Sequence, residues 1–167
     1  MPKYQELPYE RDKAVEYAHT WAFGRNPAYY NFDPMGGDCT NFASQVLYSG
    51  SGIMNFKPLY GWYYNNLANR TPSWSGVEFL YNFLIGNKES GPYAERVDVH
   101  NILPGDLIQL SFTGNEFEHT PIVVQTGNPA NIDNILVTTH TYDSDNRRLT
   151  SYNWNEIRFL HIVGVRV

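Results

Sequence analysis

The chain has one cysteine in 167 residues, Cys39, so it cannot form a disulfide within itself. Zinc sites built from several thiolates are excluded for the same reason. The chain also lacks any apolar run close to the roughly 20 residues that span a bilayer, so no membrane span is expected. Cys39 is therefore either a small buried hydrophobic residue or a reactive thiol.

Positive charge is also scarce. Lysine and arginine number 12 against 17 aspartates and glutamates, which gives a formal net charge of −5. The only adjacent basic residues are Arg147 and Arg148, so we expect no nucleic-acid partner. Residues 1–13 are polar and contain no signal-peptide core, so we expect no targeting segment there and the sequence does not fix a localisation.

Aromatic residues, in contrast, are abundant. They make up 16% of the chain, with 13 tyrosines and 4 tryptophans, within a hydrophobic content of 42%. This composition predicts one packed domain over residues 1–167. Some of the rings must lie partly at the surface, where Tyr and Trp often line binding clefts; the alternative is a core with ordinary exposed tyrosines.

Hydrophobic periodicity changes along the chain. Helical spacing in the first half predicts helices over residues 9–23, 38–49 and 73–86. In the second half, β-rich runs predict strands over residues 107–112, 120–126, 135–141 and 157–167. Helices followed by an antiparallel meander indicate an α+β fold in which N-terminal helices pack on a C-terminal sheet.

The segment GGDCTNFASQ, residues 36–45, places Cys39 at the start of a predicted helix. A free thiol has a pKa of about 8.5, and the partial positive charge of a helix N-terminus favours its thiolate. Asp38 suits the N-cap, and Gly36 and Gly37 allow the backbone to approach a substrate. The N–H of Cys39 is then a candidate oxyanion donor. We therefore expect a low-pKa thiol in an open cleft.

A cysteine nucleophile needs a base, and two histidines are well placed. If strands 120–126 and 135–141 pair antiparallel, the start of one lies beside the end of the other. His119 and His140 would then be neighbours, as a base and the group that orients it. The alternative is two unrelated histidines at strand ends. The sequence shows no spacing typical of a metal site, and we expect no metal or cofactor.

Five motifs occur in an order that resembles the Putative amidase domain family of Gram-positive bacteria. They are RDKAVEYAHTWAFGRNPAYYNF, GGDCTNFASQVL, SWSGVEFL, LPGDLIQL and HTYD, and they cover nearly the whole chain. More distantly, the DC pair that opens a helix, PGDL before a strand, and the histidine before IVV resemble the NlpC-type and CHAP-type cell-wall hydrolases. Those enzymes have a papain-like core of helices packed on an antiparallel sheet.

The resemblance implies a catalytic set. Cys39 would be the nucleophile and His119 the base. A polar residue on the following strand would complete the triad, best matched by His140, with Asp143 as the alternative.

The resemblance also implies a polar side chain before the cysteine that assists the oxyanion. Tyr30 and Asn31 are candidates for this role. Asp38 and Asn41 are further candidates around the site, since Asn41 lies on the helix where it could hydrogen-bond the active-site loop.

These residues predict a papain-like cysteine amidase or peptidase. The resemblance suggests that its substrate is a peptide or the peptidoglycan of the bacterial cell wall, and that it acts there. Two alternatives remain open at this point: an acyltransferase that uses the same site with an amine in place of water, and an inactive papain-like binding module.

Overall fold

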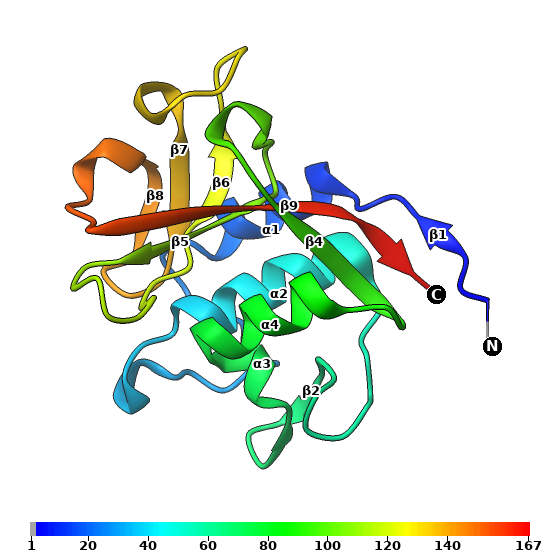
Figure 1. The fold of residues 1–167 in the computed structure, drawn as a ribbon. Coiled ribbons are helices and arrows are strands. Elements are labelled where there is room, and N and C mark those ends of the chain that lie inside the picture. Colours follow the sequence, from blue (N-terminus) through cyan, green and yellow to red (C-terminus); the bar gives the residue numbers. More distant parts are fainter. Residues whose placement is uncertain (1–2) are drawn as a thin grey trace.

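The computed structural model describes residues 3–167 as a mixed α+β protein (Figure 1). Four α-helices lie on one side of a mainly antiparallel sheet. The helices are α1 (Arg11–Trp21), α2 (Cys39–Ser51), α3 (Pro72–Ser75) and α4 (Val77–Gly86). The strands are β1 (Glu6–Leu7), β2 (Tyr64–Asn66), β3 (Asn69–Arg70), β4 (Gly91–Val97), β5 (Leu107–Ser111), β6 (Ile122–Gln125), β7 (Leu136–Thr139), β8 (Ser144–Arg148) and β9 (Glu156–Arg166). The predicted α+β class is confirmed.

The predicted helix over residues 73–86 is interrupted at Gly76. There the backbone is extended, with φ −111° and ψ 128°, so α3 ends and α4 begins. A Cβ at this position would lie 2.8 Å from Phe79 and 3.1 Å from the carbonyl oxygen of Pro72. Glycine therefore allows the close approach of the two helices.

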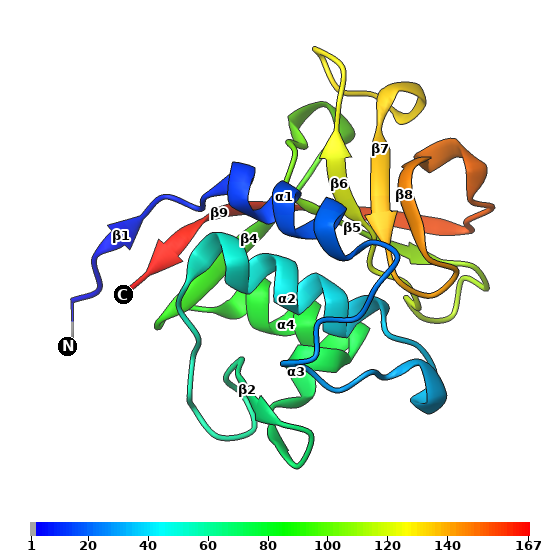
Figure 2. The ribbon, with the colours of Figure 1, turned by 180° about the vertical axis from the view of Figure 1, so that it is seen from behind.

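The sheet has the strand order β1-β9-β5-β6-β7-β8, with β4 paired to the other edge of β9. Strands β5, β6 and β7 form a meander as predicted, β8 extends it with a strand that was not predicted, and β9 returns beside β5. Seen from behind, α1 lies across β6 and β7 (Figure 2). Among residues 3–167, no helix combines the length and the apolarity needed to cross a bilayer.

Side-chain alternation in the meander fixes which residues share a face. His119 forms an isolated bridge opposite Leu110, and Val123 pairs with Val137. Leu110, Val123 and Val137 belong to a core on the sheet face away from α2. Ile122 belongs to the other core, which the helices complete. His119 and Ile122 therefore lie on opposite faces.

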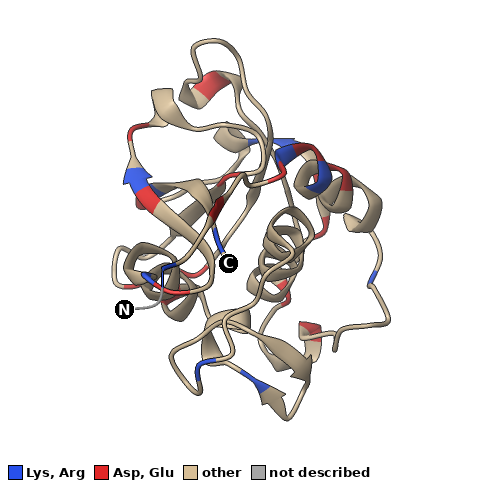
Figure 3. Ribbon diagram, turned by 90° about the vertical axis from the view of Figure 1, so that its right-hand side faces the viewer, with Lys and Arg blue, Asp and Glu red and all other residues tan. Residues whose placement is uncertain are grey.

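Charged residues are spread over the helices, strands and loops. Figure 3 shows lysine and arginine interspersed with aspartate and glutamate. The ion pairs that tie distant parts together include Arg11 with the buried Asp106, at 2.7 Å, and the buried Arg158 with Glu78, at 2.8 Å.

Candidate active site

Cys39 is the first residue of α2, as predicted. Asp38 occupies the N-cap position, but its side chain makes no capping hydrogen bond. The backbone N–H of Cys39 makes no hydrogen bond to any residue within 3–167, as is usual in the first turn of a helix. This N–H is therefore available to a ligand at the helix terminus.

The thiol of Cys39 lies in a tight environment. The residue is 7% exposed, and Sγ lies 4.0 Å from the carbonyl oxygen of Glu118 and 3.7 Å from Oγ1 of Thr40. Burial raises the pKa of the Cys39 thiol, although hydrogen bonds from the Thr120 backbone and from Thr40 act against this rise. The expectation of a low-pKa thiol in an open cleft is therefore wrong, because the residue is buried and this desolvation outweighs the hydrogen bonds from Thr120 and Thr40.

His119 lies just before β6 and is 5% exposed. Its Nε2 lies 3.5 Å from Oγ1 of Thr139 and 3.5 Å from the hydroxyl of Tyr152. Nδ1 makes no hydrogen bond to another part of the described chain. Burial, together with the positive charge of Arg147, lowers the pKa of His119 to about 4. The imidazole is therefore neutral at neutral pH.

The hydroxyl of Thr139 determines the tautomer of His119. This hydroxyl donates its one hydrogen to the carbonyl oxygen of His140, at 2.8 Å. Its oxygen can therefore only accept from His119, which requires the ring hydrogen to be on Nε2. The lone pair of a neutral ring is then on Nδ1, the nitrogen without a partner.

The thiol of Cys39 lies against the backbone of residues 118–120, the segment that contains His119. Sγ approaches the carbonyl of Glu118 and the backbone N–H of Thr120, the two residues on either side of His119. No hydrogen bond joins the thiol to the imidazole among the described residues. Such bonds are often long in a resting enzyme and tighten when substrate binds.

Tyr152 belongs to the same cluster. Burial raises the pKa of Tyr152, Arg147 opposes that rise, and the charge on Cys39 adds to it. The guanidinium of Arg147 lies 3.8 Å from the centre of the Tyr152 ring. Tyr152 and Thr139 were not predicted from the sequence, because neither lies in a motif and Tyr152 reaches the site from the loop after β8.

His140 does not contact His119. Its Nδ1 lies 2.5 Å from Oδ2 of Asp38, and its Nε2 donates to the carbonyl oxygen of Trp21 at 2.8 Å. Its ring stacks on Phe42 of α2, with 3.8 Å between ring centres. His140 follows Thr139 in the chain and so faces the opposite side of the sheet from His119. The structure therefore does not bring His140 to the position of an orienting group.

Asp38 and His140 form a buried ion pair. Burial acts to raise the pKa of Asp38, but hydrogen bonds from His140, from the N–H of Phe32 and from Asn41 outweigh it and leave that pKa below its usual value. Both nitrogens of His140 lie within hydrogen-bond distance of an oxygen acceptor. The pair ties the loop before Cys39 to the end of β7.

We expect His140→Ala to lower the free energy of unfolding by about 3 kcal/mol, because it leaves the buried Asp38 carboxylate without its imidazole partner and with only the longer ion-pair contact to Arg25, at 3.6 Å. His19→Ala is the matched control. His19 pairs with Asp145 at the surface, 2.7 Å away, so its loss should cost less than about 1 kcal/mol. Urea unfolding of both variants measures the difference. Equal losses of unfolding free energy in the two variants would show that the buried pair stabilises the fold no more than the surface pair does.

Asn41 braces the loop before Cys39. Its amide nitrogen donates to the carbonyl of Tyr30 and to Asp38, both at 2.9 Å, and its amide oxygen accepts from Nε1 of Trp74 at 3.0 Å. Tyr30 also donates its backbone N–H to the hydroxyl of Tyr64. Asn41 and Asp38 therefore position the loop through bonds that leave little capacity for a substrate.

The remaining predicted residues make local contacts. The side-chain oxygen of Asn31 accepts from the N–H of Asp33 at 2.9 Å, which forms an Asx turn. Asp143 pairs with Arg25 at 2.9 Å, and Arg25 also contacts Asp33 at 2.8 Å. The structure therefore joins Asp143 to a surface ion-pair network and not to His119.

The turn after β7 packs against the loop before Cys39. Thr141 accepts a hydrogen bond from the N–H of Asp38 at 3.2 Å. At Gly37, φ is +126° and a Cβ would lie 2.9 Å from the Thr141 hydroxyl, so only glycine fits. Within residues 3–167, no group of three or more His, Cys, Asp or Glu side chains is placed to hold a metal ion.

Comparison with known proteins identifies a family but says little about the reaction. The Putative amidase domain matches residues 8–163. The chain is 37% identical over 142 residues to the uncharacterized protein YhbB of Bacillus subtilis, which covers 81% of this chain and 42% of YhbB. The chain thus spans less than half of that relative's length. No solved structure matches. The match to nearly the whole chain shows that the protein belongs to the Putative amidase domain family.

Proposed function

We propose that the protein is a cysteine-dependent amide hydrolase with a single papain-like domain, in which Cys39 is the nucleophile and His119 the general base. One observation carries this proposal. The helix-terminal thiol lies against the backbone on both sides of a histidine whose Nε2 is directed to Thr139 and whose Nδ1 is unpaired. Membership of an amidase family supports the reaction class.

The resting pair is a neutral thiol and a neutral imidazole. The pKa of the Cys39 thiol is raised and that of His119 is lowered to about 4, so the proton stays on sulfur. As Sγ forms a bond to the amide carbonyl, the thiol proton moves to Nδ1 of His119. The carbonyl oxygen becomes an oxyanion, and the unpaired N–H of Cys39 can donate to it.

The tetrahedral intermediate then loses the amine. Nδ1 of His119 returns its proton to the leaving nitrogen as the carbon–nitrogen bond breaks, which leaves a thioester on Cys39. The imidazole, neutral again, takes a proton from water. The resulting attack releases the acid and returns the proton to sulfur.

Thr139 fills the third position in this proposal. It lies on the strand after His119, where a polar residue was expected, and accepts from Nε2. Tyr152 supports the same nitrogen from the other chain segment. These contacts hold the ring in the tautomer that leaves Nδ1 as the base.

We expect Thr139→Val to lower kcat/KM by about 10- to 100-fold, because the isosteric side chain cannot accept from Nε2 and the wrong tautomer becomes populated. Thr139→Ser should restore most of the activity. Thr138→Val is the matched control: Thr138 is the adjacent buried threonine, and it bonds Asp145 on the other face. Equal losses in Thr139→Val and Thr138→Val would remove Thr139 from the site.

We propose peptidoglycan as the substrate because the DC pair that opens the helix, PGDL before a strand and the histidine before IVV resemble motifs of cell-wall hydrolases. Incubation with purified peptidoglycan from several bacterial species, followed by mass spectrometry, tests this. The expected products carry one new carboxyl and one new amine for each amide cleaved. If peptidoglycan yields no such fragments while simple peptides are cleaved, the substrate is wrong and the reaction class stands.

A further inference from the structure

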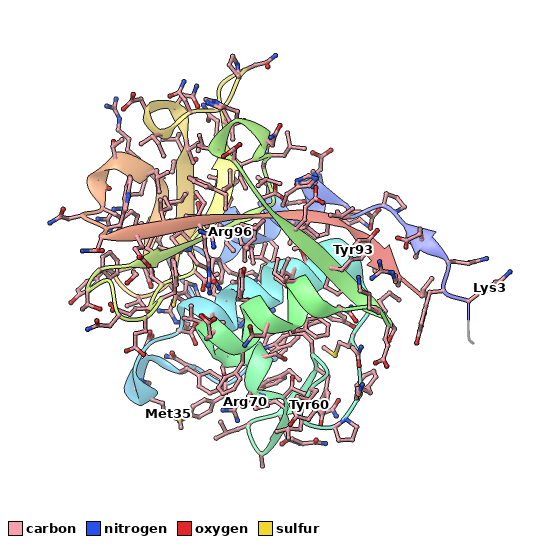
Figure 4. The ribbon with its side chains drawn as sticks, in the orientation of Figure 1. Lys3, Met35, Tyr60, Arg70, Tyr93 and Arg96 are labelled. Atoms are coloured by element: carbon pink, nitrogen blue, oxygen red, sulfur yellow. The ribbon has the colours of Figure 1, made fainter. Side chains whose placement is uncertain are left out.

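A hollow lies apart from Cys39, between the loop at residues 55–61 and helix α4. Its cavity volume is about 560 Å³, and neither Cys39 nor His119 lines it. Figure 4 shows Tyr60 at this end of the molecule, beyond α3 and α4. Three of its lining side chains are large, apolar and exposed: Leu59 at 59%, Tyr60 at 75% and Phe79 at 60%. We call this hollow the aromatic groove.

The loop at the aromatic groove is strained. Leu59 has φ +66°, and the N–H of Tyr60 bonds the carbonyl of Pro58 at 2.7 Å across it. This is a γ-turn with positive φ, a rare and strained form for a leucine. A glycine would relieve the strain. The leucine instead places an exposed apolar side chain in the groove wall, so the fold alone does not explain it.

Polar groups alternate with the apolar ones in the groove. Lys57 and Glu89 pair at 3.4 Å. The amide of Asn82, the ammonium of Lys88 and the hydroxyl of Tyr60 make no hydrogen bond or ion pair within the described residues. A wholly apolar partner, such as the face of a helix, would bury these groups without partners, which is unfavourable.

We propose that the aromatic groove binds an oligosaccharide of N-acetylated amino sugars. The C–H faces of the sugar rings can pack on Tyr60 and Phe79, while hydroxyl and acetamido groups bond Asn82 and Lys88. Small-molecule sites typically have a mainly apolar wall with a small number of oriented polar groups. The choice of amino sugars rests on the proposed cell-wall substrate; the binding itself requires no catalysis.

The test is calorimetric titration of the folded protein with the tetramer of N-acetylglucosamine. Tyr60→Ala and Phe79→Ala should each weaken binding at least about ten-fold, since aromatic side chains that become buried on binding contribute most of the binding free energy. Phe23→Ala is the matched control, because Phe23 is also an exposed ring, 71% accessible, but does not line the groove. It should bind as the wild type does.

Leu59→Gly gives a second readout. The strain argument predicts a higher melting temperature together with weaker binding, whereas a loop with no binding role would show only the first change. Absence of tetramer binding, or equal binding by the wild type, Tyr60→Ala and Phe79→Ala, would overturn the proposal. Titration and turnover of the wild-type protein separate the two proposals: binding without turnover supports the groove alone, and turnover without binding supports only the hydrolase.

Discussion

Replacing Cys39 with alanine should lower the rate of amide hydrolysis by about 10⁴-fold or more, because the covalent route through a thioester is lost. The expected change in the free energy of unfolding is only about 1 kcal/mol, since one small buried atom is removed. The rate of release of new amines from peptidoglycan measures the first quantity, and urea unfolding measures the second. A fall in activity with stability retained identifies a chemical role.

Cys39→Ser provides the control for shape. Serine keeps a similar volume and a hydrogen-bonding group, but its hydroxyl is a far weaker nucleophile with the same base. It should therefore be nearly as inactive as the alanine variant. Wild-type turnover by either variant would show that the reaction does not pass through this sulfur.

His119→Ala should reduce turnover by a similar factor, because the Cys39 thiol keeps its proton when no base can take it. The raised pKa of this thiol makes the base necessary at neutral pH. Folded His119 has a pKa of about 4, so the ring is a competent base above that pH and becomes protonated below it. The wild-type kcat/KM should therefore fall on the acid side near pH 4, well below the usual histidine range.

His100→Ala is a suitable control for this substitution, since the His100 ring bonds the carbonyl of Ala130 at 2.9 Å and lies outside the site. It should leave both the rate and its pH dependence unchanged. An acid limb near pH 6.5 in the wild type, or full activity in His119→Ala, would contradict the assignment of His119.

Local features of the site could be predicted from the sequence. Gly37 and Asp38 mark the start of α2, so the position of Cys39 followed directly. Periodicity predicts only one buried face of this helix, whereas all of residues 39–47 are buried. The meander was predictable from the alternating runs around His119. These signals lie within about ten residues of the feature that they predict.

Non-local features could not be predicted in this way. Strand β4 begins with glycine and proline, which suit an edge strand but hide its pairing with β9. Strand β8 is polar because it lies at the other edge, so its sequence contains no β-rich run that would predict a strand.

The His140 expectation shows a limit of another kind. Pairing of the two strands places His119 and His140 at the same end of the sheet. Successive side chains of a strand, however, point to opposite faces of the sheet. Thr139 therefore reaches His119, and His140 reaches Asp38. The thiol pKa is likewise set by side chains that surround Cys39 from distant segments, which no local motif records.

The double variant Cys39→Ala/His119→Ala tests the central claim most directly. If the two residues act as one nucleophile–base unit, the double variant should be no more than a few-fold slower than the slower single variant, because removing either member already disables the unit. The rates of amine release by the four proteins give this comparison. Independent roles would multiply the two losses, and a double variant slower by the product of both factors would contradict the account.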